Sequence, residues 1–141
     1  LMEEYKKDLF LSEYGIAFPD STELTGIILS EVQFRLFDSF NFSKKDTIDF
    51  LHSFSETSFD ALDNDFKLID VYNQYRIVPL KKIYINWNDF EKIDKIDVDF
   101  LDKYFDDIWF PSVDDIEIFD DTFNWMISIR HYGSVMIKQK I

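Results

Sequence analysis

The sequence predicts an α+β fold, with N-terminal helices packed on an antiparallel sheet and a C-terminal β-meander. Apolar residues of the first half recur at spacings of three and four, the period of a helix, whereas those of residues 123–130 alternate with polar ones, as in a strand. Early helices followed by late strands are typical of this class. The chain has 141 residues, 46% of them hydrophobic, and no Gly- or Pro-rich linker, so we expect a single globular domain over 1–141.

Two elements are predicted in the N-terminal part. Apolar residues at helical spacing predict a helix over 2–14, and Gly15 follows at the position of a C-terminal stop. Residues 25–37 are richer in Ile, Val and Phe, and apolar and polar side chains alternate around Phe34. This alternation predicts a strand with one solvent-exposed face, and a helix is the alternative.

The middle of the chain gives mixed signals. Ser43 is a residue type that caps helices, and apolar residues follow it at spacings of three, which predicts a helix over 44–55. Residues 59–72 fit both a helix and a strand, because a turn-like acidic run interrupts their apolar pattern. Alternation predicts a strand over 82–87, and a short helical turn is expected over 89–92.

The last third of the chain is predicted to form one helix followed by the strands of a sheet. Asp97 precedes apolar residues at helical spacing, which predicts a helix over 98–105 with an acidic N-cap. Residues 131–134 are expected to form a hairpin loop in which Gly133 takes a positive φ. The strands expected in this part are 107–110, 116–119, 123–130 and 135–140.

The residue types exclude several kinds of active site. The absence of cysteine removes disulfides, thiolate nucleophiles and cysteine-based zinc sites. The two histidines, His52 and His131, lie in no metal or nucleophile motif, and no phosphate-binding glycine loop is present. The aspartates of residues 94–102 lack the glycine and the closing glutamate of a calcium loop. We therefore predict no catalytic residue, no metal site and no cofactor, and we expect a protein that is not an enzyme.

Signals for membrane insertion and export are also missing from the sequence. The longest aliphatic run, Ile27-Ile28-Leu29, is far shorter than the roughly 20 apolar residues that a membrane span requires. The N-terminal residues mix charges of both signs, whereas a secretory signal has a basic stub followed by an apolar stretch. We expect a cytoplasmic protein that does not contact a membrane.

The negative charge is concentrated in one part of the chain. With 28 acidic and 15 basic side chains, the formal net charge is −13. Residues 89–121 contribute −10, residues 1–88 contribute −6 and residues 122–141 contribute +3. So much negative charge repels nucleic-acid phosphates, so the expected partner is a basic protein and direct binding of nucleic acid is not expected.

Aromatic and acidic residues interleave within residues 89–121, and this segment gives the candidate contact surface. Charges further apart than the Debye length of about 8 Å are screened, so a local cluster steers a basic partner better than dispersed charge. An aromatic side chain at its centre would anchor the complex, although periodic aromatic residues also build cores. The predicted partner-binding residues are Asp106, Asp107, Trp109, Asp114, Asp115, Glu117, Asp120 and Asp121.

Several stretches of the C-terminal part together resemble a known family. They are residues 84–90 (YINWNDF), 106–111 (DDIWFP), 114–120 (DDIEIFD), Trp125 and 129–133 (IRHYG). In these stretches the chain resembles small acidic immunity proteins of bacterial polymorphic or contact-dependent toxin systems. The resemblance implies a cytoplasmic antitoxin that binds a toxin domain, often a basic nuclease, and blocks it without performing chemistry. It assigns no binding residues.

Three other functions stay open on the sequence. A nucleic-acid mimic needs an extended row of carboxylates, because duplex DNA carries a charge about every 1.7 Å along its axis. A small carboxylate-dependent enzyme needs a deep pocket in which acids converge with His131. A homodimer needs an exposed apolar patch, which the many aromatic residues would supply.

Overall fold

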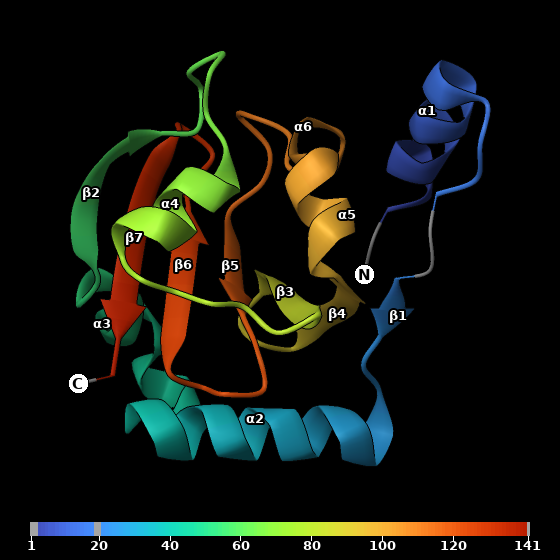
Figure 1. The fold of residues 1–141 in the computed structure, drawn as a ribbon. Coiled ribbons are helices and arrows are strands. Elements are labelled where there is room, and N and C mark those ends of the chain that lie inside the picture. The colour runs from blue at the N-terminus through green and yellow to red at the C-terminus, as the bar shows by residue number, and fades with distance from the viewer. Residues whose placement is uncertain (1–2, 19–20, 141) are drawn as a thin grey trace.

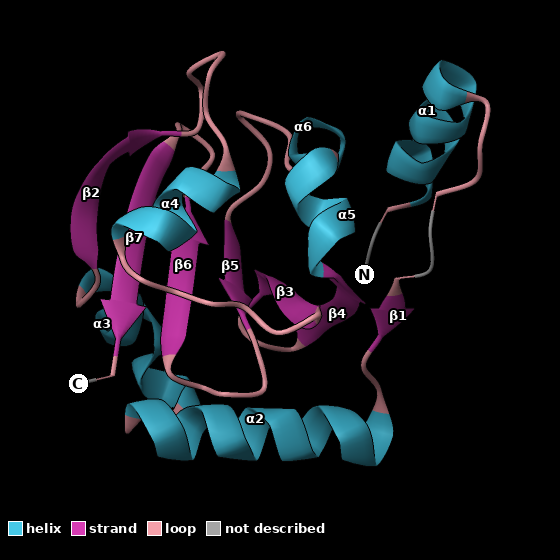
Figure 2. Ribbon diagram, viewed as in Figure 1, coloured by secondary structure: helices cyan, strands magenta, loops and turns pink. Residues whose placement is uncertain are grey.

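The protein is built around a seven-stranded antiparallel sheet with helices on both faces (Figure 1, Figure 2). The computed structural model describes residues 3–18 and 21–140. The strands are β1 (Thr22–Glu23), β2 (Ser55–Asp60), β3 (Lys82–Asn88), β4 (Lys92–Asp97), β5 (Ile116–Phe119), β6 (Trp125–Ile129) and β7 (Ser134–Gln139). The helices are α1 (Glu4–Tyr14), α2 (Gly26–Phe40), α3 (Thr47–His52), α4 (Leu68–Gln74), α5 (Val98–Lys103) and α6 (Phe105–Ile108), with a short 3-10 helix, η1 (Lys44–Asp46), before α3. The predicted α+β class is confirmed.

The strands lie in the order β1-β4-β3-β5-β6-β7-β2. β5, β6 and β7 are neighbours in the chain and in the sheet, and they form the predicted C-terminal meander. The β6–β7 hairpin turns at Gly133, whose φ of 98° agrees with the prediction. β3 pairs with β5, with Ile85 opposite Ile118, and so joins the β3–β4 hairpin to the meander. β1 and β2, from the N-terminal half, form the two edges of the sheet.

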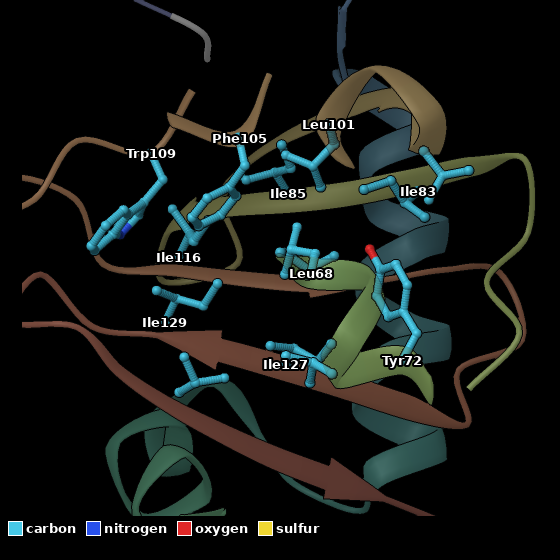
Figure 3. Close-up of a cluster of buried hydrophobic side chains, with 14 of the residues drawn as sticks. Leu68, Tyr72, Ile83, Ile85, Leu101, Phe105, Trp109, Ile116, Ile127 and Ile129 are labelled. Carbon is cyan, nitrogen blue, oxygen red and sulfur yellow. The ribbon is translucent and has the colours of Figure 1, made fainter. Parts of the chain in front are cut away.

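One face of the sheet, which we call the apolar face, is covered by α4, α5 and α6. Ile85 and Ile127 of the central strands are fully buried on this face. Leu68 and Tyr72 of α4 and Leu101 of α5 pack onto them (Figure 3). Each such side chain contributes roughly 1.5–3 kcal/mol through burial, so this cluster is a main source of stability.

The opposite face, which we call the mixed face, is covered by α2 and α3. Leu36 of α2 and Phe50 of α3 pack there with Met126 of β6. Because strand side chains alternate between faces, the residues next to the inward isoleucines of β3, β5 and β6 point to this side. Three of them are buried and polar: Asn86, Glu117 and Ser128.

Helix α1 follows the predicted boundaries closely. The predicted helix over 2–14 is found at Glu4–Tyr14, and Met2 lies outside the described residues. Gly15 ends the helix with a φ of 70°, as expected for a C-terminal stop. Phe10 packs edge-on against Tyr104 with ring centroids 4.9 Å apart, so α1 lies beside α5 and α6 (Figure 1).

The strand predicted over residues 25–37 is wrong, because this segment lies in the 15-residue helix α2. Val32, Leu36 and Phe40 are four residues apart and are all buried, which places them on one side of a helix. Phe34 is 72% exposed on the outer side. The alternation around Phe34 therefore mixes inward and outward positions of a helix, and the helical alternative is correct.

The strand predicted over residues 107–110 is also wrong. These residues belong to α6 and to the loop that follows it. Phe105, Ile108 and Trp109 are buried with the residues of the apolar face. Their spacing of three and four fits one turn of helix, so the apolar run reflects the packing of a short helix and not strand pairing.

Boundaries in the middle of the chain also differ from the prediction. The helix predicted over 44–55 is shorter, because Ser55–Asp60 pairs with β7 as strand β2. The ambiguous segment 59–72 contains the end of β2 and the start of α4. Residues 89–91 form the turn of the β3–β4 hairpin and Lys92 begins β4, so the helical turn predicted over 89–92 is wrong.

Candidate functional site

The eight predicted partner-binding residues separate into buried and exposed groups. Trp109, Asp114, Glu117 and Asp120 are buried, Asp107 and Asp121 are partly buried, and Asp106 and Asp115 are exposed. A buried carboxylate needs a hydrogen-bond donor or a cation inside the protein. Part of the negative charge of residues 89–121 therefore has a structural role.

Asp120 and Asp121 follow the C-terminal end of β5. Oδ2 of Asp120 accepts hydrogen bonds from the backbone N of Leu80 (3.0 Å) and from Nε1 of Trp125 (3.2 Å). The hydroxyl of Tyr84 donates to Oδ1 of Asp121 at 2.7 Å. These two acids hold the chain around β5 in place.

Trp109 and Asp107 fix the position of α6. The ring of Trp109 stacks on Phe105 with centroids 5.6 Å apart, and its Nε1 donates to the carbonyl of Asp114 at 2.9 Å. The hydroxyl of Tyr14 donates to Oδ2 of Asp107 at 2.7 Å, and this hydrogen bond raises the pKa of Tyr14 to about 12. Both residues thus tie α6 to its surroundings.

Three of the predicted residues come together at the N-terminal end of β5. Asp115 and Glu117 line a hollow of about 300 Å³, and Asp114 lines a neighbouring one. The walls come from α3, the β3–β4 hairpin, the loop before β5, β5 itself and the residue after β6. We call the first one the acidic hollow, and its lining residues are Leu51, Trp87, Asn88, Asp89, Val113, Asp115, Glu117 and Arg130.

The β3–β4 turn brings Asp89 to the acidic hollow. Oδ1 of Asn86 accepts hydrogen bonds from the backbone N of Asn88 (3.2 Å) and of Phe90 (2.8 Å), which fixes the turn. Asp89 and Phe90 have φ values of 49° and 58°. Aspartate and asparagine adopt such left-handed values more readily than most residues. Asp89 therefore suits the backbone of the turn and adds charge to the hollow.

Glu117 is the buried acid of the hollow. Its side chain is 4% exposed, accepts hydrogen bonds from Asn86 Nδ2 (2.6 Å) and Ser128 Oγ (3.1 Å), and forms an ion pair with Arg130. Burial raises the pKa of Glu117, and the Arg130 guanidinium opposes this shift. Among the described residues that are not exposed, Nε of Arg130 is the buried side-chain nitrogen that has no hydrogen-bond partner. Arg130 thus compensates the charge of Glu117, although its own hydrogen bonding is incomplete.

Asp115 is the more accessible acid of the hollow, with a side chain 43% exposed. Its Oδ1 accepts a hydrogen bond from the backbone N of His131 (2.6 Å) and lies 2.9 Å from His131 Nδ1. Partial burial acts to raise the pKa of Asp115, but the contacts with His131 and the charge of Arg130 outweigh it and lower the pKa. Asp115 is therefore ionised at neutral pH.

Two more hollows adjoin the acidic hollow through shared lining residues. One of about 350 Å³ extends to Glu3 and Asp114, and one of about 430 Å³ extends to His52 and Glu56. Among the described residues, six carboxylates and the two cationic side chains Lys92 and Arg130 line the three hollows. The mixed face therefore opens into a groove with an excess of negative charge.

The groove and its surroundings show no arrangement typical of a metal centre. Within residues 3–18 and 21–140, no group of three or more histidine, aspartate or glutamate side chains is placed to hold a metal ion. In the same part of the chain, no helix is both long and apolar enough to cross a membrane.

The chain matches no protein-family model, no curated protein and no solved structure. What the fold and the site define is an α+β protein whose mixed sheet face ends in an acid-lined groove.

Sequence reasoning did not assign Trp87, Asp89 or Arg130 to the site. In a strand, residues two positions apart lie on the same side. In the strand predicted over 123–130, this places Arg130 on the side of Ser128, and that was the available signal for Arg130. For Asp89, the signal was a polar turn sequence directly after a strand. No local pattern indicates Trp87, because only the fold brings it to the loop before β5.

Proposed function

We propose that the chain is a non-catalytic binding protein of the immunity type, which binds a basic toxin domain and neutralises it. One observation carries this proposal. Asp89, Asp115 and Glu117 converge on the acidic hollow, and Arg130, the one cationic side chain among the described residues that line it, is already paired with Glu117. A surface with this excess of negative charge attracts a basic partner and disfavours an acidic one.

The charge outside the core supports the same function. Four buried acids and one buried lysine account for −3 of the net charge of −13, so −10 remains on the rest of the chain. Such a field raises association rates by roughly 10 to 1000-fold at low ionic strength, and salt screens it. We therefore expect a complex whose affinity falls as salt is added.

The grouping of the carboxylates favours this function over a nucleic-acid mimic. A mimic presents acids in an extended row, because it replaces the phosphates of a strand. Asp89, Asp115 and Glu117 instead line a single hollow of about 300 Å³. Carboxylates that line one hollow suit a single basic side chain that projects from a partner. They suit less well a partner whose groove normally binds a nucleic-acid duplex.

The direct test is a binding titration against the protein that the neighbouring gene encodes. The double variant Asp89→Asn/Asp115→Asn removes two charges from the acidic hollow. Its matched control is Asp70→Asn/Asp99→Asn, which removes two exposed charges from α4 and α5 on the apolar face. We expect the first variant to bind about tenfold more weakly at low salt and to show a smaller salt dependence. Equal affinities for the two double variants would contradict the proposal.

A second candidate function, a small carboxylate-dependent enzyme, is favoured by Glu117. A buried acid with a raised pKa at the wall of a hollow is a common feature of active sites. Stoichiometry separates the two functions. An inhibitor abolishes the activity of the toxin at one equivalent, whereas an enzyme that inactivates the toxin does so at a small fraction of an equivalent.

A further inference from the structure

The loop before β5 already binds one cation of this chain. The ammonium of Lys6 donates to the carbonyl of Ile108 (2.9 Å) and to Oδ2 of Asp114 (2.5 Å). It also lies 4.4 Å from the centroid of the Trp87 ring and 4.8 Å from that of Phe110. The Lys6 side chain is fully buried, so α1 fills this site, which we call the Lys6 site, from within. A carboxylate, a carbonyl and aromatic rings are thus the means by which this region holds a positive charge.

The acidic hollow has a similar set of groups beside the Lys6 site. Trp87 belongs to both, and Asp115 of the hollow directly follows Asp114 of the Lys6 site. Leu51 and Val113 add apolar wall on which the methylene groups of a long side chain can lie. The two sites differ in one respect. Lys6 fills its own site, whereas no side chain of the described residues fills the acidic hollow in this way.

The charges of the hollow are not balanced within the described part of the chain. Arg130 pairs with Glu117 and so compensates one of the three carboxylates. Asp115 contacts His131, which carries charge only when protonated, and its side chain is 43% exposed. Asp89 lies in the turn and forms no ion pair with any described residue. Two accessible carboxylates thus face a partly apolar hollow, where an ion pair is stronger than it is in open water.

We infer that the acidic hollow is a socket for one cationic side chain, an arginine or a lysine, that projects from the protein partner. Asp89 and Asp115 would accept its hydrogen bonds at the rim, and Leu51 and Val113 would contact its methylene groups. This inference rests on the proposed function, because it names the chemistry by which the groove recognises a basic protein. Arginine is the better fit, since its planar guanidinium pairs with carboxylates through several donors and is more weakly hydrated than an ammonium.

The groups in the hollow disfavour other ligands. Three carboxylates against one paired arginine repel phosphates and carboxylates. In the described part of the chain no set of three ligand side chains is placed for a metal ion. A neutral side chain would leave Asp89 and Asp115 without a new partner, so it would gain only contacts with the apolar wall.

The test is a titration of the full chain, labelled with ¹⁵N, by Nα-acetyl-arginine amide. Nα-acetyl-citrulline amide serves as the matched neutral ligand, with NaCl added to keep the ionic strength constant. The indole N–H signal of Trp87 reports on the hollow, and the buried Trp125, whose indole N–H donates to Asp120 at the other end of β5, is the internal control in the same spectrum. We expect the arginine compound to shift the Trp87 signal with a Kd on the order of 10 mM, as one or two charge-assisted hydrogen bonds allow. Citrulline should bind at least tenfold more weakly.

Variants locate the binding to the acidic hollow. Asp89→Asn should weaken arginine binding at least threefold, and Asp70→Asn on α4 should leave it unchanged. Nα-acetyl-lysine amide should bind with the same dependence on Asp89. Equal binding of arginine and citrulline, equal effects of the two variants, or no shift of the Trp87 signal at all would each overturn the inference.

The same measurements separate this inference from the proposed function. If arginine binds in the hollow but no basic protein forms a complex, the socket is correct and the proposed function is wrong. If a basic protein binds with an affinity that Asp89→Asn does not change, and arginine does not shift the Trp87 signal, the proposed function holds and the socket is wrong.

Discussion

The two faces of the sheet are made by the same strands, yet they differ in chemistry. The apolar face packs isoleucines such as Ile85 and Ile127 against three helices. The mixed face buries Asn86, Glu117 and Ser128 on the neighbouring positions of those strands. Helices cover both faces, so a polar residue in a central strand does not reach solvent and must find its partner inside the protein. The apolar face therefore mainly provides stability, and the mixed face combines stability with a groove that is open to a ligand.

The largest expected effect comes from removing the cation of the mixed face. In Arg130→Met, Glu117 stays buried without its counter-ion, and we expect a loss of roughly 3–5 kcal/mol in the free energy of unfolding at pH 7. Burial already raises the pKa of Glu117, and without Arg130 the pKa rises further. Because the folded protein then holds this proton more tightly than the unfolded chain, the loss is small near pH 4 and grows as the pH rises. Urea unfolding at several pH values measures both effects.

A double variant tests whether the charge of Glu117 causes this loss. Glu117→Gln/Arg130→Met keeps an acceptor for Asn86 and Ser128 but removes both charges. It should recover most of the stability at pH 7 and show little of the pH dependence. A double variant that is as unstable as Arg130→Met would assign the loss to packing of the Arg130 side chain and not to the unpaired charge.

A core deletion on the apolar face should cost somewhat less and should not depend on pH. Ile127 is fully buried, so Ile127→Ala is expected to lower the free energy of unfolding by about 3 kcal/mol. Ile127→Val removes one methylene group and should cost about 1 kcal/mol. Denaturation at pH 5 and pH 7 should give the same difference from wild type for each variant. A difference that changed with pH would mean that the apolar face is coupled to a titrating group.

On the apolar face, the free energy of unfolding should depend on pH through Asp102. This effect is smaller than the one expected for Arg130→Met on the mixed face. The hydroxyl of Tyr72 donates to Oδ1 of Asp102 at 3.0 Å, and burial raises the pKa of Asp102 to about 6, against the opposing effect of this hydrogen bond. The folded protein therefore binds this proton more tightly than the unfolded chain, whose pKa is near 3.8. The stabilising contribution is complete below about pH 4 and is lost as the pH rises through about 6. Solvent screening limits it to about 1 kcal/mol, because the side chain is partly exposed.

Asp102→Asn isolates this contribution, because asparagine keeps an acceptor for Tyr72 and does not titrate. The unfolding free energies of wild type and variant should diverge between pH 4 and pH 6, with wild type losing relative stability as the pH rises. Parallel curves over this range would show that Asp102 has the same pKa in the folded and unfolded states.

Parts of the fold that have a local sequence pattern were predictable, and parts without one were not. The meander was predictable because the period of two in residues 125–130 and a glycine at the hairpin are local signals, although the strand predicted over 123–130 is shorter, Trp125–Ile129. Strand β4 was missed, since the two apolar residues of Lys92–Asp97, Ile93 and Ile96, are three apart and pack on opposite faces of the sheet, so the segment shows no alternation. Helix α2 was misread because Phe34 is exposed, so its apolar residues do not mark a single buried side.

The site was only partly predictable for a related reason. The concentration of acid drew attention to Asp115 and Glu117, which line the acidic hollow. It gave equal weight to Asp114 and Asp120, which the fold buries against donors of its own. Charge counted along a chain does not show which carboxylates acquire internal partners, because those partners come from distant segments, as Lys6 does for Asp114.

The smallest effect on stability should come from Asp89, and this separates recognition from stability on the mixed face. Asp89 is exposed and has a φ of 49°, which asparagine adopts readily, so Asp89→Asn should change the unfolding free energy by less than about 0.5 kcal/mol. Asp89→Ala removes the same charge but strains the turn, and should cost about 1 kcal/mol. Both variants should weaken the binding of a basic ligand to the same extent. If only Asp89→Ala weakened it, the hollow would depend on the shape of the turn, and the carboxylate of Asp89 would have no part in recognition.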